Sequence, residues 1–332
     1  MTFASIVVPA YNVQKTLAET LISLLAQTHQ AFEIVLVNDG STDGTLDIAR
    51  QFATDPRLRI ITQANRGLAG ARNTGIAAAR GEVIGFCDSD DLWDPRKLAA
   101  HVAHLAANPH VGVSYSGSAL IDDDSNSLGQ AQRPRLADVD AAHVFARNPI
   151  GNGSAPVIRR AVFDDIAYRP AHETGRDWYF DETFRQSEDI ECWMRIALNT
   201  SWAFAGVPGL LTLYRINNGG LSAATDKQLQ SWERMVTKLA TGHPGFVATH
   251  APRARAYQYR YLARRAISDL DTARALQLSR AWIAESRAPL IEEPAKSAVT
   301  LAAAGVLSLF GGGVLGDAIV AWSRLVRREA RS

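Results

Sequence analysis

The sequence predicts an α/β protein, in which a mostly parallel β-sheet flanked by helices is followed by a helical C-terminal region. Short apolar runs alternate with amphipathic stretches in the first third of the chain. Polar motifs follow several of these runs directly, and from about Lys227 onward the periodicity is helical only. The chain has 332 residues, enough for one large domain and an extension, which we place at residues 1–225 and 226–332.

The predicted strands are short runs rich in β-branched residues that end at proline or polar residues. They are expected at residues 5–9, 32–37, 58–62, 83–87 and 111–116. Helices are expected between them, at residues 13–26, 42–52, 67–80 and 95–107. Ser41 or Thr42 would cap the second helix, and the third, rich in glycine and alanine, should pack tightly. This alternation predicts βαβ units, whose ligands bind beyond the carboxyl ends of the strands.

The second half of the chain is less regular. Residues 122–142 are polar and are expected to form a loop or a partly ordered insertion. Apolar periodicity returns at residues 157–163 and 189–198, and residues 253–284 should form one or two helices.

Residues 298–316 contain no charged residue. Their length is near the lower limit for a membrane span, and the glycine run 311–313 should break a helix. A basic stretch follows, with Arg324, Arg327, Arg328 and Arg331. Three interpretations stay open: a helix on a membrane surface, helices packed on the soluble domain, or a true span.

An acidic motif, Asp88-Ser89-Asp90-Asp91, follows the fourth predicted strand. Two carboxylates at this spacing can share a hard divalent cation such as Mg²⁺ or Mn²⁺, which prefers oxygen ligands. Such a cation can neutralise a leaving diphosphate. The alternative is a solvated acidic turn that begins the next helix.

Two further motifs lie beyond the second and third strands. Asp39 can accept hydrogen bonds from a base or a ribose, although its surroundings also fit an Asx turn. Arg72 lies in the glycine-rich segment and could meet a phosphate or a nucleoside. The glycine spacing there is not a dinucleotide fingerprint, which should follow the first strand.

A pair of carboxylates, Glu188 and Asp189, begins a predicted helix. A carboxylate at a helix N-terminus stays ionised and could act as a general base toward an acceptor hydroxyl. The alternative is a common acidic helix start with no catalytic role.

Taken in order, these motifs resemble those of the family 2 glycosyltransferases, which have the GT-A fold. The resemblance covers about residues 3–220 and rests on Val8-Pro9-Ala10-Tyr11-Asn12, Val37-Asn38-Asp39-Gly40-Ser41-Thr42-Asp43, Arg66-Gly67-Leu68-Ala69-Gly70-Ala71-Arg72-Asn73, Asp88-Ser89-Asp90-Asp91 and Glu188-Asp189. Each motif alone is weak, and the ordered set is specific.

The resemblance implies an inverting transfer of a sugar from a nucleotide-diphosphate donor, with a UDP-sugar expected, to a hydroxyl of a saccharide or lipid-linked acceptor. It also implies Mn²⁺ or Mg²⁺ as cofactor and a role in cell-envelope or exopolysaccharide biosynthesis. The implied nucleotide-binding residues are Pro9, Tyr11, Asp39, Arg72 and Asp88, with Asp90 as metal ligand and Asp189 as base.

Other segments match the family less closely. Glu188 and Arg215 are candidates for an acceptor or diphosphate loop, together with Gly219-Gly220-Leu221-Ser222. Gly151-Asn152-Gly153-Ser154 lies where members present an acceptor-side loop. Glu191 replaces the aspartate often found two places past the base, which should have no consequence because both are carboxylates.

Three other functions fit the sequence less well. A non-catalytic nucleotide-sugar-binding module is disfavoured because Asp90 and Asp189 are both present. A nucleotidyltransferase or an NAD-dependent oxidoreductase would show a glycine-rich loop after the first strand, where Pro9-Ala10-Tyr11-Asn12 stands instead.

Composition bounds the partners and the compartment. The net charge of +1 gives no field that favours nucleic acid. Cys87 and Cys192 are too few for a disulfide framework and should be reduced and buried. The N-terminus shows no signal-peptide pattern, so we expect a cytoplasmic protein, with contact to the inner face of the membrane as one interpretation.

Overall fold

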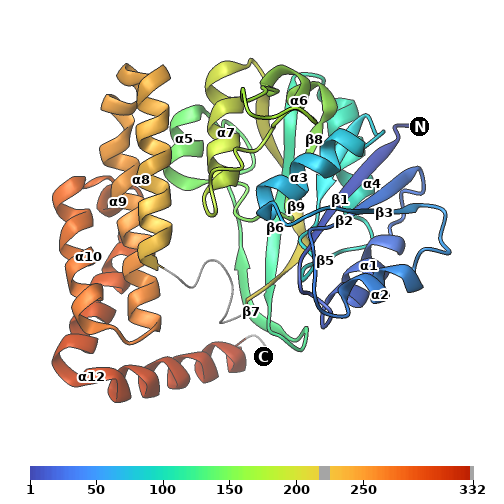
Figure 1. Ribbon diagram of the computed structural model, residues 1–332. Helices are drawn as coiled ribbons and strands as arrows, with labels where there is room; N and C mark the ends of the chain where they lie inside the picture. Colours follow the sequence, from blue (N-terminus) through green and yellow to red (C-terminus); the bar gives the residue numbers. More distant parts are fainter. Residues whose placement is uncertain (217–224, 330–332) are drawn as a thin grey trace. The chain divides into compact units, whose positions relative to one another are not determined.

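The computed structural model describes residues 1–216 and 225–329, with only the backbone described at residues 225 and 312–329 (Figure 1). The chain divides into two compact units. The first comprises residues 1–144 and 148–223, and the second comprises residues 145–147 and 224–332. Three residues from the middle of the chain, Phe145–Arg147, therefore belong to the C-terminal unit.

The first unit is built on a nine-stranded sheet. Its N-terminal half is parallel, in the order β3-β2-β1-β4. The strands are β1 (Ala4–Ala10), β2 (Phe32–Asn38), β3 (Leu58–Thr62) and β4 (Val83–Phe86), and the helices along this half are α1 (Leu17–Leu25), α2 (Thr45–Gln51), α3 (Gly67–Ala78) and α4 (Lys97–Ala107). The strands and helices predicted for residues 5–107 are thus confirmed, with small differences at their ends.

The other half of the sheet is mixed. Here β8 pairs antiparallel with both β4 and β6, whereas β9 pairs parallel with β6. Short β5 and β7 add antiparallel pairings to β9 and β6. These strands are β5 (Leu92–Trp93), β6 (Val111–Ile121), β7 (Ser127–Gln132), β8 (Val157–Arg159) and β9 (Ala203–Arg215). The predicted α/β fold is confirmed, but the sheet is less parallel than predicted, because an apolar run reads the same in either direction.

Helix α3 lies directly on β1, as its composition predicts. A Cβ at Gly75 would come 2.2 Å from Val7 Cγ1, so only glycine allows this approach of helix to strand. The main hydrophobic core of the unit is formed by residues of the sheet and of the helices beside it. It includes Ile6 of β1, Leu21 of α1 and Ile34 of β2, all fully buried.

Two local predictions need correction. Residues 122–142 are not one loop, because they contain β7, which pairs with β6 despite its polar sequence, and the start of α5 (Ala141–Arg147). The apolar periodicity predicted at residues 157–163 falls on β8 and on α6 (Arg160–Ile166), and that at residues 189–198 falls on α7 (Glu188–Asn199).

The second correction concerns the start of α2. Helix α2 begins only at Thr45, so neither Ser41 nor Thr42 caps it. Both residues instead bond the loop after β1: Asn12 N donates to Ser41 Oγ (3.2 Å), and Thr42 N donates to Asn12 Oδ1 (2.9 Å). Their polar groups hold two strand-end loops together.

The second unit is helical throughout its described part. It contains α8 (Thr225–Gly242), α9 (Pro244–Ser268), α10 (Thr272–Glu285), α11 (Ala288–Glu292) and α12 (Pro294–Glu329). Buried Leu262, Leu278 and Leu307 form its core. Non-helical dihedrals at Gly311 (φ 75°, ψ 178°) interrupt α12, which confirms the predicted break at the glycine run.

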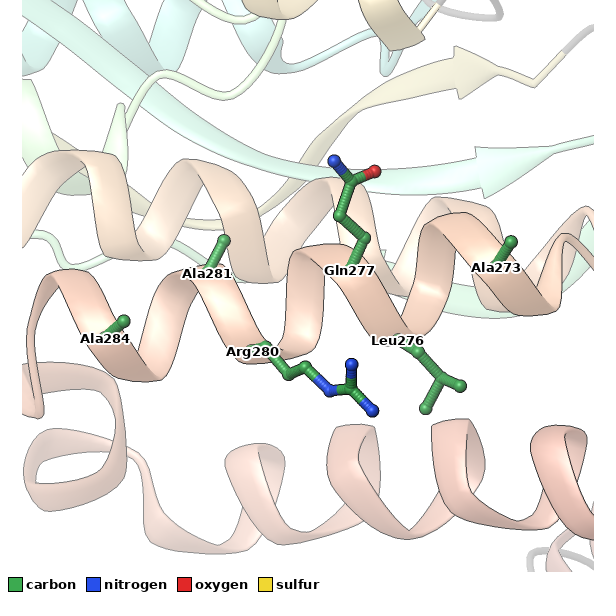
Figure 2. A pocket seen from close by; sticks show the side chains of 6 residues that line it. All are labelled: Ala273, Leu276, Gln277, Arg280, Ala281 and Ala284. Carbon is green, nitrogen blue, oxygen red and sulfur yellow. The ribbon is translucent and has the colours of Figure 1, made fainter.

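One face of α10 borders an open groove of about 580 Å³ (Figure 2). Small and apolar side chains predominate there, with Arg280 as the single charged residue among those that line it. The lining residues are Ala273, Leu276, Gln277, Arg280, Ala281 and Ala284. This composition offers an apolar surface and no set of catalytic groups.

Candidate active site

The carboxyl ends of β1, β2 and β4 meet at one edge of the sheet, as expected for adjacent parallel strands. Pro9 is buried near the end of β1. The pairing of β1 with β4 ends at Val7 and Phe86, so Pro9 lies past the part of β1 that pairs with β4. Tyr11 follows the strand and keeps 51% of its surface exposed. An exposed aromatic ring beside a buried strand end offers a flat surface for a nucleoside base.

Asp39 follows β2 and is buried. Its carboxylate accepts hydrogen bonds from the backbone nitrogens of Arg66 (2.9 Å) and Gly67 (2.8 Å), and from Gln63 Nε2 (2.6 Å). The carboxylate therefore caps the start of α3. A carboxylate has about four lone-pair sites, so one remains for a further donor.

Arg72 lies at the centre of the site and is 2% exposed. Its Nη2 donates to Asp88 Oδ1 (2.8 Å) beyond β4, and its Nη1 donates to Glu188 Oε1 (2.9 Å) at the start of α7. Although burial opposes the charge, these two carboxylates raise the pKa of Arg72 above its usual value. Arg72 thus joins two motifs that lie 100 residues apart in the sequence.

The two carboxylates at the start of α7 differ in burial. Glu188 is 6% exposed, and burial together with neighbouring Asp189 raises its pKa to about 7, against the opposing effect of Arg72. Asp189 is partly exposed and accepts a hydrogen bond from Ile190 N (2.7 Å) through Oδ1. Burial also raises the pKa of Asp189. A carboxylate with a raised pKa is a stronger base than an ordinary aspartate.

Asp90 lines an open cavity of about 290 Å³. Polar and charged side chains predominate around it, among them Asn12, Gln14, Lys15 and Asp43. The described residues contain no group of three acidic, histidine or cysteine side chains that could hold a metal ion alone. Asp88 and Asp90 nevertheless supply hard oxygen donors, and Mg²⁺ or Mn²⁺ commonly takes only one or two carboxylates together with substrate phosphates.

Arg215 ends β9, and its buried guanidinium uses all its donors within the chain. Nε donates to the backbone oxygen of Asp90 (2.7 Å), Nη1 to those of Asp122 (2.7 Å) and Asp123 (2.9 Å), and Nη2 to Glu19 (3.0 Å) and Ser125 (2.9 Å). Arg215 has no donor left for a diphosphate, which was the contact expected from the sequence. The geometry instead favours a role in holding the Asp90 turn in place. The segment Gly219-Gly220-Leu221-Ser222, which was expected to act with Arg215, lies outside the described residues.

A comparison with protein families identifies the strand-end motifs. The model of glycosyl transferase family 2 matches residues 5–166. Those residues belong to glycosyl transferase family 2. The matched residues include nearly all of β1 and the whole of β2, β3 and β4. They also include all six nucleotide and metal candidates, namely Pro9, Tyr11, Asp39, Arg72, Asp88 and Asp90.

Curated relatives are named as glycosyltransferases. An uncharacterised glycosyltransferase of Nostoc sp. is 40% identical over 49% of this chain and 52% of its own length, so the chain spans about half of that relative. A second, the UDP-Glc:alpha-D-GlcNAc-diphosphoundecaprenol beta-1,3-glucosyltransferase WfgD of Escherichia coli, is 27% identical over 69% of this chain and 83% of its own. Both names, like the family match, are those of glycosyltransferases.

Solved structures establish the GT-A fold. TarS 1–349 of S. aureus, in complex with UDP, superposes with a TM-score of 0.59 at 19% identity, over 90% of this chain and 88% of that one. The mannosyltransferase PcManGT of Pyrobaculum calidifontis, in complex with GDP-Man and Mn²⁺, gives 0.58 at 23% identity, over 93% and 87%.

Several residues of the family 2 site were not singled out from the sequence. Asn73 and Glu182 hold the segment before α7 against α3, and Ser154 and Asp91 lie behind the Asp90 turn. Asn73, Asp91 and Ser154 fall inside the motifs quoted above, whereas Glu182 does not. Their roles needed the fold, because each acts on a segment distant in sequence.

Proposed function

We propose that this protein is an inverting, metal-dependent glycosyltransferase that moves a sugar from a nucleotide-diphosphate donor, with a UDP-sugar as the first candidate, to a hydroxyl acceptor. One observation carries the proposal: Arg72 joins Asp88, at the strand-end motif, to Glu188, next to the candidate base Asp189. A donor site and a base must be held side by side for direct displacement at an anomeric carbon.

The donor would bind along the strand ends. Tyr11 and Pro9 offer a surface for the base, and Asp39 has room for one more donated hydrogen bond. Arg72 and Asp88 would lie nearer the diphosphate. The UDP complex of TarS and the UDP-Glc in the name of WfgD support a uridine nucleotide as the first candidate.

Asp90, with Asp88 beside it, would hold a divalent cation. Bound there, Mn²⁺ or Mg²⁺ would supply neutralising charge for the diphosphate that leaves. The chain's own contribution is to place two oxygen donors at the end of β4, and the GDP-Man and Mn²⁺ complex of PcManGT supports a metal of this class.

Asp189 would take the proton from the acceptor hydroxyl. Its Oδ2 makes no hydrogen bond to any residue in the described ranges, so this oxygen is available to a hydroxyl. Attack by that hydroxyl on the face opposite the leaving diphosphate would invert the anomeric centre.

The test is donor binding by thermal shift, using UDP-glucose, UDP-N-acetylglucosamine and GDP-mannose with MnCl₂ or EDTA. A bound donor should raise the melting temperature by mass action. Asp90→Ala should remove the metal-dependent part of the shift, and Asp189→Asn should keep the shift and lose transfer. Binding by the wild type without transfer to any hydroxyl would instead support the non-catalytic module.

We also propose a lipid-linked acceptor at the inner face of the cytoplasmic membrane. The diphosphoundecaprenol in the name of WfgD supports the acceptor class. Pro294–Gly311 of α12 is the one stretch, among the described helices, that is long and apolar enough to cross a membrane, and only 22% of it is buried. Eighteen residues are near the lower limit for a span, so contact with the surface is the simpler role.

A further inference from the structure

The hydroxyl of Ser154 lies behind the Asp88–Asp91 turn and bonds both of its ends. The backbone nitrogen of Asp88 donates to Ser154 Oγ (2.8 Å), and that hydroxyl donates to Asp91 Oδ2 (2.5 Å). A serine hydroxyl has a single proton, so these two bonds fix its orientation. Ser154 has no exposed surface, and one side chain therefore sets the first and last residues of the turn that carries Asp90.

Asp91 is committed to this arrangement through both oxygens. Its Oδ1 accepts from the backbone nitrogen of Arg215 (2.8 Å), and its side chain is fully buried. The carboxylate is therefore buried, with both oxygens bonded inside the chain. Its contacts tie the turn to β9 on one side and to the loop before β8 on the other.

The loop that carries Ser154 is itself fixed from behind. Ser154 N donates to Asn152 Oδ1 (3.1 Å), and Ser154 O accepts from Trp93 Nε1 (3.1 Å). Lys97 Nζ, also buried, donates to the next carbonyl, that of Ala155 (2.8 Å), and to Thr212 Oγ1 (2.8 Å). Because these partners are buried and bonded, Ser154 cannot follow the turn if the turn moves.

We propose that Ser154 is a positioning residue for metal binding: by holding Asp88 N and Asp91, it presents the Asp90 carboxylate to the cation in one orientation. The inference rests on the proposed role of Asp90 as metal ligand. Partners in the outer shell of a metal site commonly change metal affinity 10- to 100-fold when they are replaced. Ser154 would act at this level, without touching the cation or the donor.

The test compares Ser154→Ala with Thr212→Val by calorimetric titration of UDP, with and without MnCl₂, and by thermal unfolding. Thr212→Val removes a buried hydroxyl from the same network but leaves both bonds to the turn in place. In Ser154→Ala we expect the Mn²⁺-dependent gain in UDP affinity to fall about tenfold, with metal-free affinity within twofold of wild type. Thr212→Val should lower the melting temperature and keep the gain.

Asp91→Ala is a second variant that tests the same contact if Ser154→Ala does not fold. It should also lower the Mn²⁺-dependent gain, and the double variant should lose little more than Asp91→Ala alone, because the bond between Ser154 and Asp91 is already absent in it. A gain in Ser154→Ala equal to that of Thr212→Val would overturn the proposal and leave Ser154 as a packing residue. If the wild type shows no gain with Mn²⁺, the proposed metal function fails, and this inference fails with it.

Discussion

At the scale of single residues, the site depends on a close approach between Gly153 and the Arg72–Asp88 pair. A Cβ at Gly153 would lie 2.1 Å from Arg72 Nη2 and 2.8 Å from Asp88 Oδ2. Arg72 cannot move easily, because it is buried and also bonded to Glu188. The loop before β8 thus needs glycine here to keep the ion pair in place.

Gly153→Ala should therefore lower kcat/KM at least tenfold and destabilise the fold by about 1–3 kcal/mol, the usual effect of overpacking. Steady-state kinetics with the donor identified by thermal shift, together with urea unfolding, would measure both effects. Gly245→Ala is the matched control, since a Cβ at Gly245 meets nothing within 4 Å. Activity of Gly153→Ala within twofold of wild type would show that the ion pair tolerates displacement.

The two carboxylates of α7 predict the pH dependence of transfer. Burial raises the pKa values of Glu188 (to about 7) and Asp189, whereas ordinary carboxyls titrate at about 4. Because a base must be deprotonated, kcat/KM should fall with decreasing pH at a higher pH than an ordinary aspartate would give. Glu188→Gln removes the neighbouring negative charge and should move this acid limb to lower pH. A wild-type limb at the pH of an ordinary aspartate would contradict the raised pKa of Asp189.

At the scale of elements, the connection from α6 to α7 is held against α3 by Asn73. Its Oδ1 accepts from the backbone nitrogens of Tyr179 (3.0 Å) and Phe180 (2.8 Å), and its Nδ2 donates to Phe180 O (2.8 Å) and Glu182 Oε1 (2.9 Å). Glu182 also accepts from Arg66 Nε (2.8 Å). This connection leads into the N-terminus of α7. The contacts with α3 therefore help to position the candidate base, Asp189, at the start of α7.

Asn73→Ala should loosen this connection, because it removes four hydrogen bonds to buried or half-buried groups. We expect faster tryptic cleavage in residues 167–187 and a kcat at least tenfold lower, with a smaller effect on donor affinity. Asn108→Ala serves as control, since the Asn108 side chain bonds only within α4 and its end. An unchanged cleavage rate would mean that the remaining ion pairs suffice.

Features of the fold and the site that depend on a local sequence pattern could be predicted, whereas those that depend on contacts between distant segments could not. The strands and helices up to residue 107 were predictable because burial of a strand or of a helix face is a local pattern. The antiparallel direction of β8 could not be predicted, because the direction of a strand depends on the path of the chain before it. Polar β7 was missed because its stabilisation comes from its pairing with β6. In the candidate site, the motifs suggested Asp39, Arg72 and Asp88 as candidates. The bonds from Arg72 to Glu188 and from Ser154 to Asp91 join segments that only the fold brings together.

At the scale of the whole molecule, charge is divided unevenly along the chain. Residues 1–225 contain 19 Lys and Arg against 25 Asp and Glu, whereas residues 226–332 contain 16 against 9. The net charge of +1 hides this division. The basic part also carries the exposed apolar residues Val299, Leu309 and Phe310 of α12, which are 69%, 77% and 64% exposed. Basic charge together with exposed apolar side chains is the combination that binds anionic lipid surfaces.

The protein should therefore bind vesicles that contain anionic lipid, and binding should weaken as salt is raised, because exposed charges are screened beyond about 10 Å at 0.1 M salt. Burying a leucine or phenylalanine side chain stabilises by about 1.5–3 kcal/mol, so Leu309→Ser with Phe310→Ser should weaken binding at least tenfold. Co-sedimentation with anionic and with neutral vesicles measures both effects. Ile22→Ser is the matched control, because Ile22 is equally apolar and 59% exposed but lies on α1 in the acidic part of the chain. An equal loss of binding in the control and in the α12 variant would point to a general effect of surface hydrophobicity. If the wild-type protein does not bind anionic vesicles at low salt, the proposed contact with the membrane is wrong.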